Sequence, residues 1–347
     1  MKQTDYILPA EWYPQSGIQL TWPHAGTDWY DMLDEVESCF IDIAREISQR
    51  EPLLIVAPDI DLVRSHIEAK ICGKNIKYLQ CETNDTWARD HSGITLIQPE
   101  TGQTRILDFA FNGWGLKFAA NFDNLITSRI NENKLFNGEY VNRLNFVLEG
   151  GSIESDGNGT LLTTSECLLS PNRNGEWDKK QIESYLKENF SVQQVLWLHD
   201  HGFLSGDDTD SHIDTLARLC PDDTIAYVRC ADKDDMHYEA LSEMERQLRS
   251  FRSLEGKPFR LLPLPMAAPI YHEGERLPAT YANFLILNHA ILYPTYSQPD
   301  NDREAAHILQ QAFPGYEIIG IDCRPLIKQH GSLHCVTMQY PKGALNI

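Results

Sequence analysis

Residues 28–57 read DWYDMLDEVESCFIDIAREISQREPLLIVA. The first part of this stretch has apolar residues spaced three or four positions apart: Leu33, Val36, Phe40, Ile43 and Ile47. This period predicts an amphipathic helix over residues 28–50, and the continuous apolar run at 53–57 predicts a buried strand. The stretch is therefore a helix followed by a strand.

The same helix-then-strand unit recurs along the chain. We predict further pairs at 59–71 with 76–79, 121–132 with 144–148, 177–190 with 195–198, 234–251 with 259–264, and 300–313 with 318–321. Two hairpins interrupt them, one joining 94–98 to 105–109 and one joining 152–154 to 160–163. Alternating helices and strands first suggest a doubly wound sheet, but the hairpins fit a ring of mixed-sheet modules better. No linker rich in Ser, Pro or Gly divides the chain, so we expect a single domain, 1–347.

The composition is that of a folded protein, with 347 residues, 42% of them hydrophobic and 23% charged. The net charge of -20 argues against nucleic acid as a partner and mildly favours cationic ligands. The N-terminus shows no signal peptide, and the apolar stretches are far too short to span a membrane. We therefore expect a cytoplasmic protein whose eight cysteines, which include no CxxC pair, are thiols.

The acidic segment GDDTDSHID at 206–214, with four carboxylates and one histidine in nine residues, has several interpretations. A calcium loop starting at Asp208 would need glycine and glutamate where the chain has Ile213 and Leu219. A zinc site built from His212, Asp214 and Cys335 has suitable ligand types, although the chain has no paired cysteines. A solvated acidic turn is the third interpretation.

Four segments with reactive side chains each follow a predicted strand. They are NDTWARD at 84–90, EGG at 149–151, the acidic segment at 206–214, and GSLHC at 331–335. Because loops that leave strand ends commonly build ligand sites, we expect them to converge. Convergence would bring together Asp90, Glu149, His212, Asp214 and Cys335. Taken singly, Trp87 could be core packing, the glycines of EGG could serve a tight turn, and FNGWG at 111–115 could be a turn with an aromatic plug.

These motifs together resemble the agmatine deiminase family, to whose group the Porphyromonas-type peptidylarginine deiminases also belong. The resemblance further includes PAEW at 9–12, TWP at 21–23, ECLLSPNRN at 166–174 and residues 279–284. It implies a pentein-type fold, a five-bladed α/β propeller of ββαβ modules in a pseudo-fivefold arrangement.

The resemblance also implies roles for single residues. Cys335 would be the nucleophile, and His212 the general acid and base. Asp90 and Asp214 would grip a guanidinium group, and Glu149 would orient His212. The remaining substrate contacts would come from three residues: Trp87 and Trp114 in the pocket wall, and Asp208 near the substrate's cationic tail.

The expected activity is hydrolysis of agmatine to N-carbamoylputrescine and ammonia through a covalent amidino-cysteine intermediate, in polyamine (putrescine) biosynthesis. No metal or organic cofactor is expected, and members of the family are often dimers or larger assemblies. Three alternatives stay open: a deiminase of arginine or peptidyl-arginine, a zinc-dependent amidohydrolase using His212, Asp214 and Cys335, and a cation-binding pentein without turnover.

Overall fold

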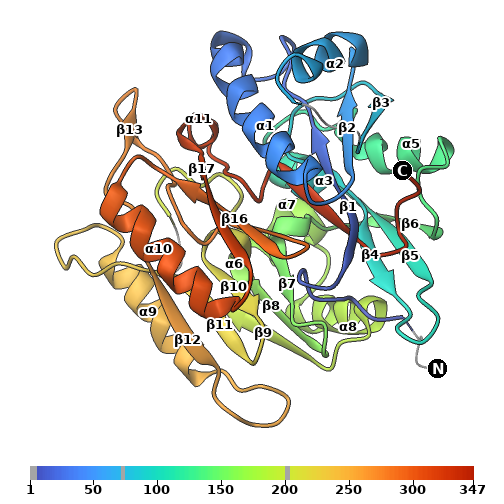
Figure 1. Ribbon diagram of the computed structural model, residues 1–347. Helices are drawn as coiled ribbons and strands as arrows, with labels where there is room; N and C mark the ends of the chain where they lie inside the picture. Colours follow the sequence, from blue (N-terminus) through green and yellow to red (C-terminus); the bar gives the residue numbers. More distant parts are fainter. Residues whose placement is uncertain (1–5, 72–74, 200–203) are drawn as a thin grey trace.

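The computed structural model describes residues 6–71, 75–199 and 204–347 (Figure 1). Its first sheet has the strand order β18-β1-β2-β3. The strands are β1 (Gln15–Thr21), β2 (Leu53–Ala57), β3 (Ile76–Gln80) and β18 (Thr337–Pro341). The last strand of the chain pairs antiparallel with the first, whereas β1, β2 and β3 are parallel neighbours. The parallel connections run through α1 (Leu33–Ser48) and α2 (Ile60–Glu68).

Four further three-stranded sheets in the described residues repeat one pattern, an antiparallel pair followed by a parallel third strand. Their strands are β4 (Ile94–Ile97), β5 (Thr104–Ala110), β6 (Glu139–Val147); β7 (Ile153–Ser155), β8 (Thr160–Thr164), β9 (Gln194–Leu198); β10 (Ala217–Cys220), β11 (Thr224–Arg229), β12 (Arg260–Pro265); and β15 (Leu285–Leu287), β16 (Ala290–Thr295), β17 (Glu317–Asp322). The helices that precede the third strands are α5 (Ile126–Glu132), α8 (Lys179–Phe190), α9 (Tyr238–Ser250) and α10 (Pro299–Ala312). Figure 1 shows the long helices towards the periphery of the molecule and the strands inside.

Short elements fill the connections. They are α3 (Ala88–His91), α4 (Gly113–Leu116), α6 (Ser165–Leu168), α7 (Pro171–Asn174), α11 (Arg324–Ile327), the 3-10 helices η1 (Tyr30–Met32), η2 (Asp123–Leu125), η3 (Gly150–Ser152) and η4 (Ile213–Thr215), and the ribbon β13 (Tyr271–His272) with β14 (Glu275–Arg276).

The fold is thus a mixed α/β arrangement of several small sheets, and not the continuous sheet of a doubly wound fold. The predicted helix-then-strand units are present, with shifted ends. Strand β6 begins at Glu139, before the predicted start. The prediction missed the first half of this strand because it is polar and partly exposed and carries no apolar run. The predicted helix at 121–132 is η2 followed by α5.

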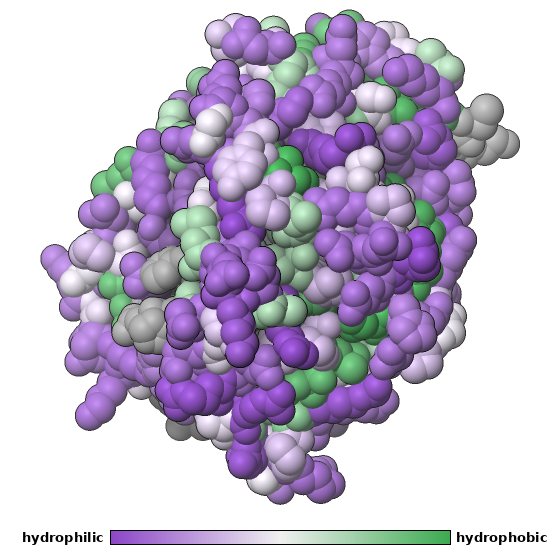
Figure 2. Space-filling model, turned by 90° about the vertical axis from the view of Figure 1, so that its left-hand side faces the viewer, coloured by the Kyte–Doolittle hydropathy of each residue, from purple (hydrophilic) through white to green (hydrophobic). Residues whose placement is uncertain are grey.

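The core confirms the helical period seen in the sequence. Val36, Phe40, Ile43 and Ile47 on α1 are fully buried, and all of β2 is buried. The seven described cysteines are free thiols, as predicted, while Cys72 lies outside the described residues. Among the described residues, no helix is long and apolar enough to cross a membrane. Hydrophilic side chains dominate the face shown in Figure 2, and hydrophobic ones form small separate patches there.

Candidate active site

Four of the described sheets each contribute one connection to a single buried cluster. Asp90 lies in α3 after β3, Glu149 follows β6, and His212 and Asp214 come between β9 and β10. Cys335 lies between α11 and β18. The structure therefore brings the predicted residues together in one cluster.

Asp90 is held by two hydrogen bonds. Its Oδ1 accepts from the backbone N–H of Gly151 at 2.9 Å, and its Oδ2 accepts from Trp114 Nε1 at 2.9 Å. The Nδ1 atom of His212 lies 3.6 Å from Oδ1. Burial raises the pKa of Asp90, and the nearby charge of Asp214 adds to this, whereas His212 lowers it.

Gly151 lies where three of these side chains meet. A Cβ atom on it would be 2.7 Å from His212 Nδ1, 2.8 Å from Asp90 Oδ1 and 3.1 Å from Asp214 Oδ2. Because Gly151, the last residue of the EGG motif, has no side chain, the imidazole and the two carboxylates can approach one another.

The Cys335 thiol lies beside Asp214 and Asn283. Its Sγ is 3.8 Å from Asp214 Oδ2 and 3.3 Å from Asn283 Nδ2. Burial raises the pKa of this thiol well above its usual value, and the carboxylates of Asp214 and Asp90 raise it further. Without a ligand the sulfur is thus a neutral thiol at neutral pH.

Asp214 is oriented by His334, the residue next to Cys335. His334 Nδ1 lies 2.8 Å from Asp214 Oδ2, and its Nε2 lies 2.9 Å from Glu11 Oε2. Burial alone would raise the pKa of Asp214, but the contact with His334 outweighs it and the pKa is lowered. Oδ1 of Asp214 is buried and has no hydrogen-bond partner, so it is free to accept one from a ligand.

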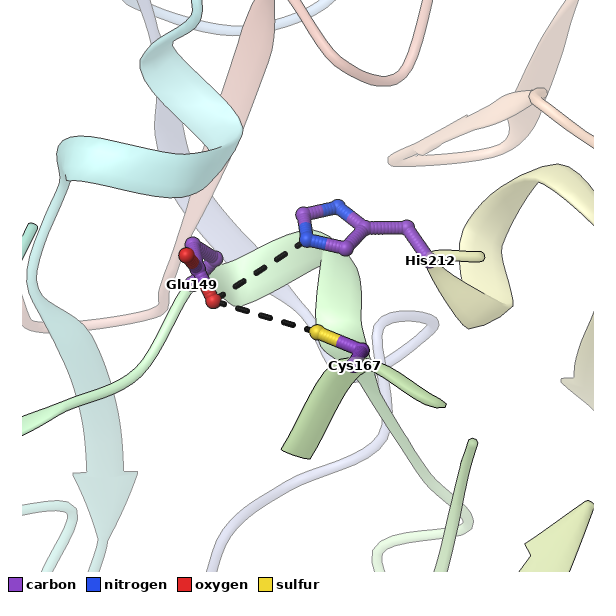
Figure 3. Close-up of side chains that lie close together, drawn as sticks. All are labelled: Glu149, Cys167 and His212. Atoms are coloured by element: carbon purple, nitrogen blue, oxygen red, sulfur yellow. Dashed lines mark hydrogen bonds and ion pairs between the residues drawn. The ribbon is translucent and has the colours of Figure 1, made fainter. Parts of the chain in front are cut away.

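Glu149 is farther from His212 than a hydrogen bond requires. His212 Nε2 and Glu149 Oε2 are 4.0 Å apart, and the same oxygen lies 4.0 Å from Cys167 Sγ (Figure 3). Arg173 Nε donates to both oxygens of Glu149, at 2.9 and 3.0 Å. Burial opposes the charged imidazole, but Asp90, Cys167 and Glu149 raise the pKa of His212 well above its usual value.

A pocket of about 320 Å³ opens onto this cluster. Its lining includes all three residues predicted to contact substrate from the wall, together with two of the cluster: Trp87, Trp114, Asp208, Asp90 and Cys335. His212, Asp214 and Glu149 are not among the residues that line it.

The indole of Trp87 forms a fixed wall of this pocket. Its Nε1 donates to Asp85 Oδ2 at 3.0 Å, and a Cβ on Gly331 would lie only 2.0 Å from its ring. Asp208 lies at another side of the pocket, where burial raises its pKa to about 6.

The acidic segment has a structural function besides its reactive residues. Asp207 accepts from the backbone N–H groups of Thr209 and Ser211, at 3.2 and 2.7 Å. Asp210 binds Arg173 Nη1 and Lys117 Nζ, each at 2.6 Å. These two aspartates therefore shape and anchor the loop, whereas Asp208 faces the pocket.

Four residues of the cluster were not singled out by the sequence: Asn283, His334, Arg173 and Cys167. All four lie inside motifs that carried the family resemblance, at 166–174, 279–284 and 331–335. Their types alone gave no signal, because a buried Asn or Arg acts through partners that only the fold brings near.

The predicted zinc set of His212, Asp214 and Cys335 does not recur among the described groups that could hold a metal ion. Those groups are Glu149 with Cys167 and His212, and Glu11 with Glu154 and His334. In the second group both glutamates already bind Arg218.

Comparisons with known proteins identify the family of this chain. The sequence model of the Porphyromonas-type peptidyl-arginine deiminase family matches residues 7–341. A provisionally named agmatine deiminase of Legionella pneumophila is 34% identical over 345 residues, covering 99% of this chain and 97% of the relative. The chain belongs to this family of hydrolases that act on C–N bonds, which confirms the resemblance drawn from the motifs.

Solved structures show the same relationship. A protein of Porphyromonas gingivalis, provisionally described as an arginine deiminase, is 52% identical with a TM-score of 0.93, and the match covers 98% of this chain and 100% of that one. A cysteine-to-serine variant of agmatine deiminase from C. jejuni, solved with substrate bound, is 39% identical with a TM-score of 0.90, covering 98% and 97%.

The contacts around Gly151 give a test of the cluster. Gly151→Ala should lower kcat/KM by about 100-fold while the protein stays folded, because the added methyl group displaces His212 and Asp90 from one another. The backbone φ of Gly151 is outside the range that favours glycine, so steric contact is the only cause. Steady-state rates and a thermal melt measure both effects, and a wild-type kcat/KM would contradict the crowding.

Proposed function

We propose that this protein is an agmatine deiminase, which hydrolyses agmatine to N-carbamoylputrescine and ammonia. The observation that carries the proposal is the Cys335 thiol at the end of an aromatic-walled pocket, beside the carboxylates of Asp90 and Asp214. The full-length similarity to relatives named agmatine deiminases supports it.

Asp90 and Asp214 are proposed to bind the guanidinium group. A guanidinium is planar and always charged near neutral pH, and carboxylates accept paired N–H bonds from it. The unpartnered Oδ1 of Asp214 and the pocket-lining position of Asp90 support this role. Trp87 and Trp114, whose rings lie edge to face with their centroids 6.3 Å apart, would form an aromatic wall beside the planar group.

Cys335 is proposed to attack the central guanidinium carbon. Its raised pKa means that the thiol loses its proton, to solvent, only when a cation offsets the two carboxylates, and the substrate supplies that cation. The new S–C bond gives a tetrahedral adduct, from which ammonia leaves with a proton from His212. An amidino-thioether remains on Cys335.

Water then completes the reaction. His212, having given up its proton, accepts one from the water that attacks the amidino carbon, and the S–C bond breaks to release N-carbamoylputrescine and the thiol. Glu149 is proposed to stabilise the imidazolium through charge at 4.0 Å. None of these steps uses a metal or organic cofactor.

The pocket lining favours agmatine over free arginine. Arginine carries a carboxylate, yet none of the described residues that line the pocket is Arg or Lys. Asp28 and Asp208 line it instead and suit the primary ammonium of agmatine. Deimination of arginine or peptidyl-arginine is the second candidate, because the Porphyromonas gingivalis relative carries an arginine deiminase description.

The finer architecture belongs to the same proposal. We propose that residues 1–347 form one domain in which the five sheets are blades of an α/β propeller around a pseudo-fivefold axis. Their shared pairing order and the convergence of connections from four of them support it. A cytoplasmic role in putrescine biosynthesis and assembly into homo-oligomers stay predictions from the resemblance.

A substrate panel tests the activity. Ammonia release should be fastest with agmatine, much slower with arginine and peptidyl-arginine, and not lowered by a chelator. Cys335→Ala should abolish release and still bind agmatine in calorimetry, because the carboxylates remain. Residual turnover near wild type in Cys335→Ala would exclude the covalent route, and binding without ammonia release by the wild-type protein would favour a cation-binding pentein.

Neutralising either carboxylate tests the guanidinium site. Asp90→Asn and Asp214→Asn should each lower kcat/KM for agmatine by at least about 10- to 100-fold, since each removes a charge-assisted hydrogen bond. Asp61→Asn, at an exposed position on α2, is the matched control and should behave as wild type. The proposed clamp fails if both site variants keep the wild-type kcat/KM.

The thiol pKa gives a pH test. In the ligand-free protein, alkylation of Cys335 by iodoacetamide should be slow at pH 7 and keep rising with pH beyond the ordinary thiol pKa of about 8.5. Peptide mass spectrometry follows this cysteine separately from the other seven. A rate that levels off below neutral pH would instead indicate a thiolate in the free enzyme.

A further inference from the structure

The group formed by Glu149, Cys167 and His212 has the geometry of a metal site that the proposed reaction does not use (Figure 3). Two of its ligand separations are 4.0 Å, and every pair of ligand atoms lies within 4.8 Å. A point equidistant from the three atoms is therefore at most about 2.5 Å from each, close to the Zn–S distance of about 2.3 Å. Small side-chain shifts bring all three into bonding range.

The ligand atoms are also available to bind an ion. His212 Nε2 is buried and has no hydrogen-bond partner, and Figure 3 shows that it points towards Glu149. All three side chains are nearly or fully buried, with exposed fractions of 0%, 0% and 1%. Arg173 Nε is shared between both oxygens of Glu149, so it keeps Oε1 when Oε2 turns to an ion.

We propose that Glu149, Cys167 and His212 bind Zn²⁺ and that this ion inhibits the enzyme. A thiolate, an imidazole and a carboxylate with a water in fourth place form a set that zinc prefers and that magnesium and calcium do not. Binding of one Zn²⁺ releases the thiol proton of Cys167 and the imidazolium proton of His212 to solvent. The net charge of the group is unchanged by this exchange.

Inhibition follows from the occupied nitrogen of His212. Once Nε2 is bound to zinc, the imidazole is fixed and can no longer pass through its protonated and neutral forms. This consequence rests on the proposed role of His212 as acid and base, whereas zinc binding does not.

The position of the site also predicts slow inhibition. Nδ1 of His212 faces Asp90, which lines the pocket, while Nε2 is directed to Glu149 and Cys167. The three ligands are buried, and His212 lies on the loop that Asp210 anchors to Arg173 and Lys117, so an ion reaches them only when this region opens locally. We therefore expect inhibition to develop after mixing and to be reversed by a chelator.

Cobalt, a spectroscopic substitute for zinc, tests binding without activity. Co²⁺ added to the Cys335→Ala protein should give a near-ultraviolet thiolate-to-cobalt band with one ion per chain, although the catalytic thiol is absent. Adding Cys167→Ala should weaken binding by more than about 100-fold, because a direct ligand is lost. Adding Cys220→Ala, at another buried cysteine, should change nothing.

Two results would overturn the proposal. One is no thiolate-to-cobalt band in Cys335→Ala, and the other is a band that survives Cys167→Ala. If Cys167→Ala does not fold by circular dichroism, Cys167→Ser keeps the side-chain size with a poor ligand and replaces it. Progress curves of ammonia release with Zn²⁺ then measure inhibition, and cobalt binding in a protein that is inactive on agmatine would separate this proposal from the activity.

Discussion

Two buried carboxylates close to Cys335, Asp90 and Asp214, are the constraint on which the rest of the centre depends. Each must be compensated, because an isolated buried charge is strongly unfavourable. The surroundings shift the two pKa values in opposite directions: burial raises the pKa of Asp90, whereas contact with His334 lowers that of Asp214. A cation placed between them stabilises both as carboxylates. The site therefore selects for a cationic ligand before any specific contact with its tail.

A fully buried arginine stabilises the residues that surround this pair. Arg218 on β10 binds Glu11 near the N-terminus and Glu154 on β7, and it donates to the carbonyl of Phe284 at 2.5 Å. Glu11 in turn contacts His334, which orients Asp214. Segments far apart in the sequence are thus joined to the reactive loop through one guanidinium. Breaking such a buried network by removing one partner costs about 3–5 kcal/mol, so the same contacts hold the fold and the reactive geometry.

The sequence predicted the elements well because apolar period and turn residues are local signals. It placed α1 and β2 correctly, and its motifs marked Asp90 and Cys335. It missed the first half of β6, because these polar residues show no strand pattern and their pairing with β5 is a contact between distant parts of the chain. It also missed Asn283 and His334, since their importance lies in a distance to Cys335 and Asp214 that no local pattern encodes. Nor does any local pattern predict the 4.0 Å distance between His212 Nε2 and Glu149 Oε2.

Charge balance also explains how such a site would release its product. Burial raises the pKa of the Cys335 thiol, and the two carboxylates beside it raise this pKa further because a thiolate would add a third negative charge. In the proposed reaction the guanidinium relieves this repulsion when it binds, and so favours the thiolate of Cys335. After hydrolysis the carbamoyl group is neutral and forms no ion pair. The carboxylates that gather a cation therefore have much less affinity for the product, and the thiol regains its proton as the pocket empties.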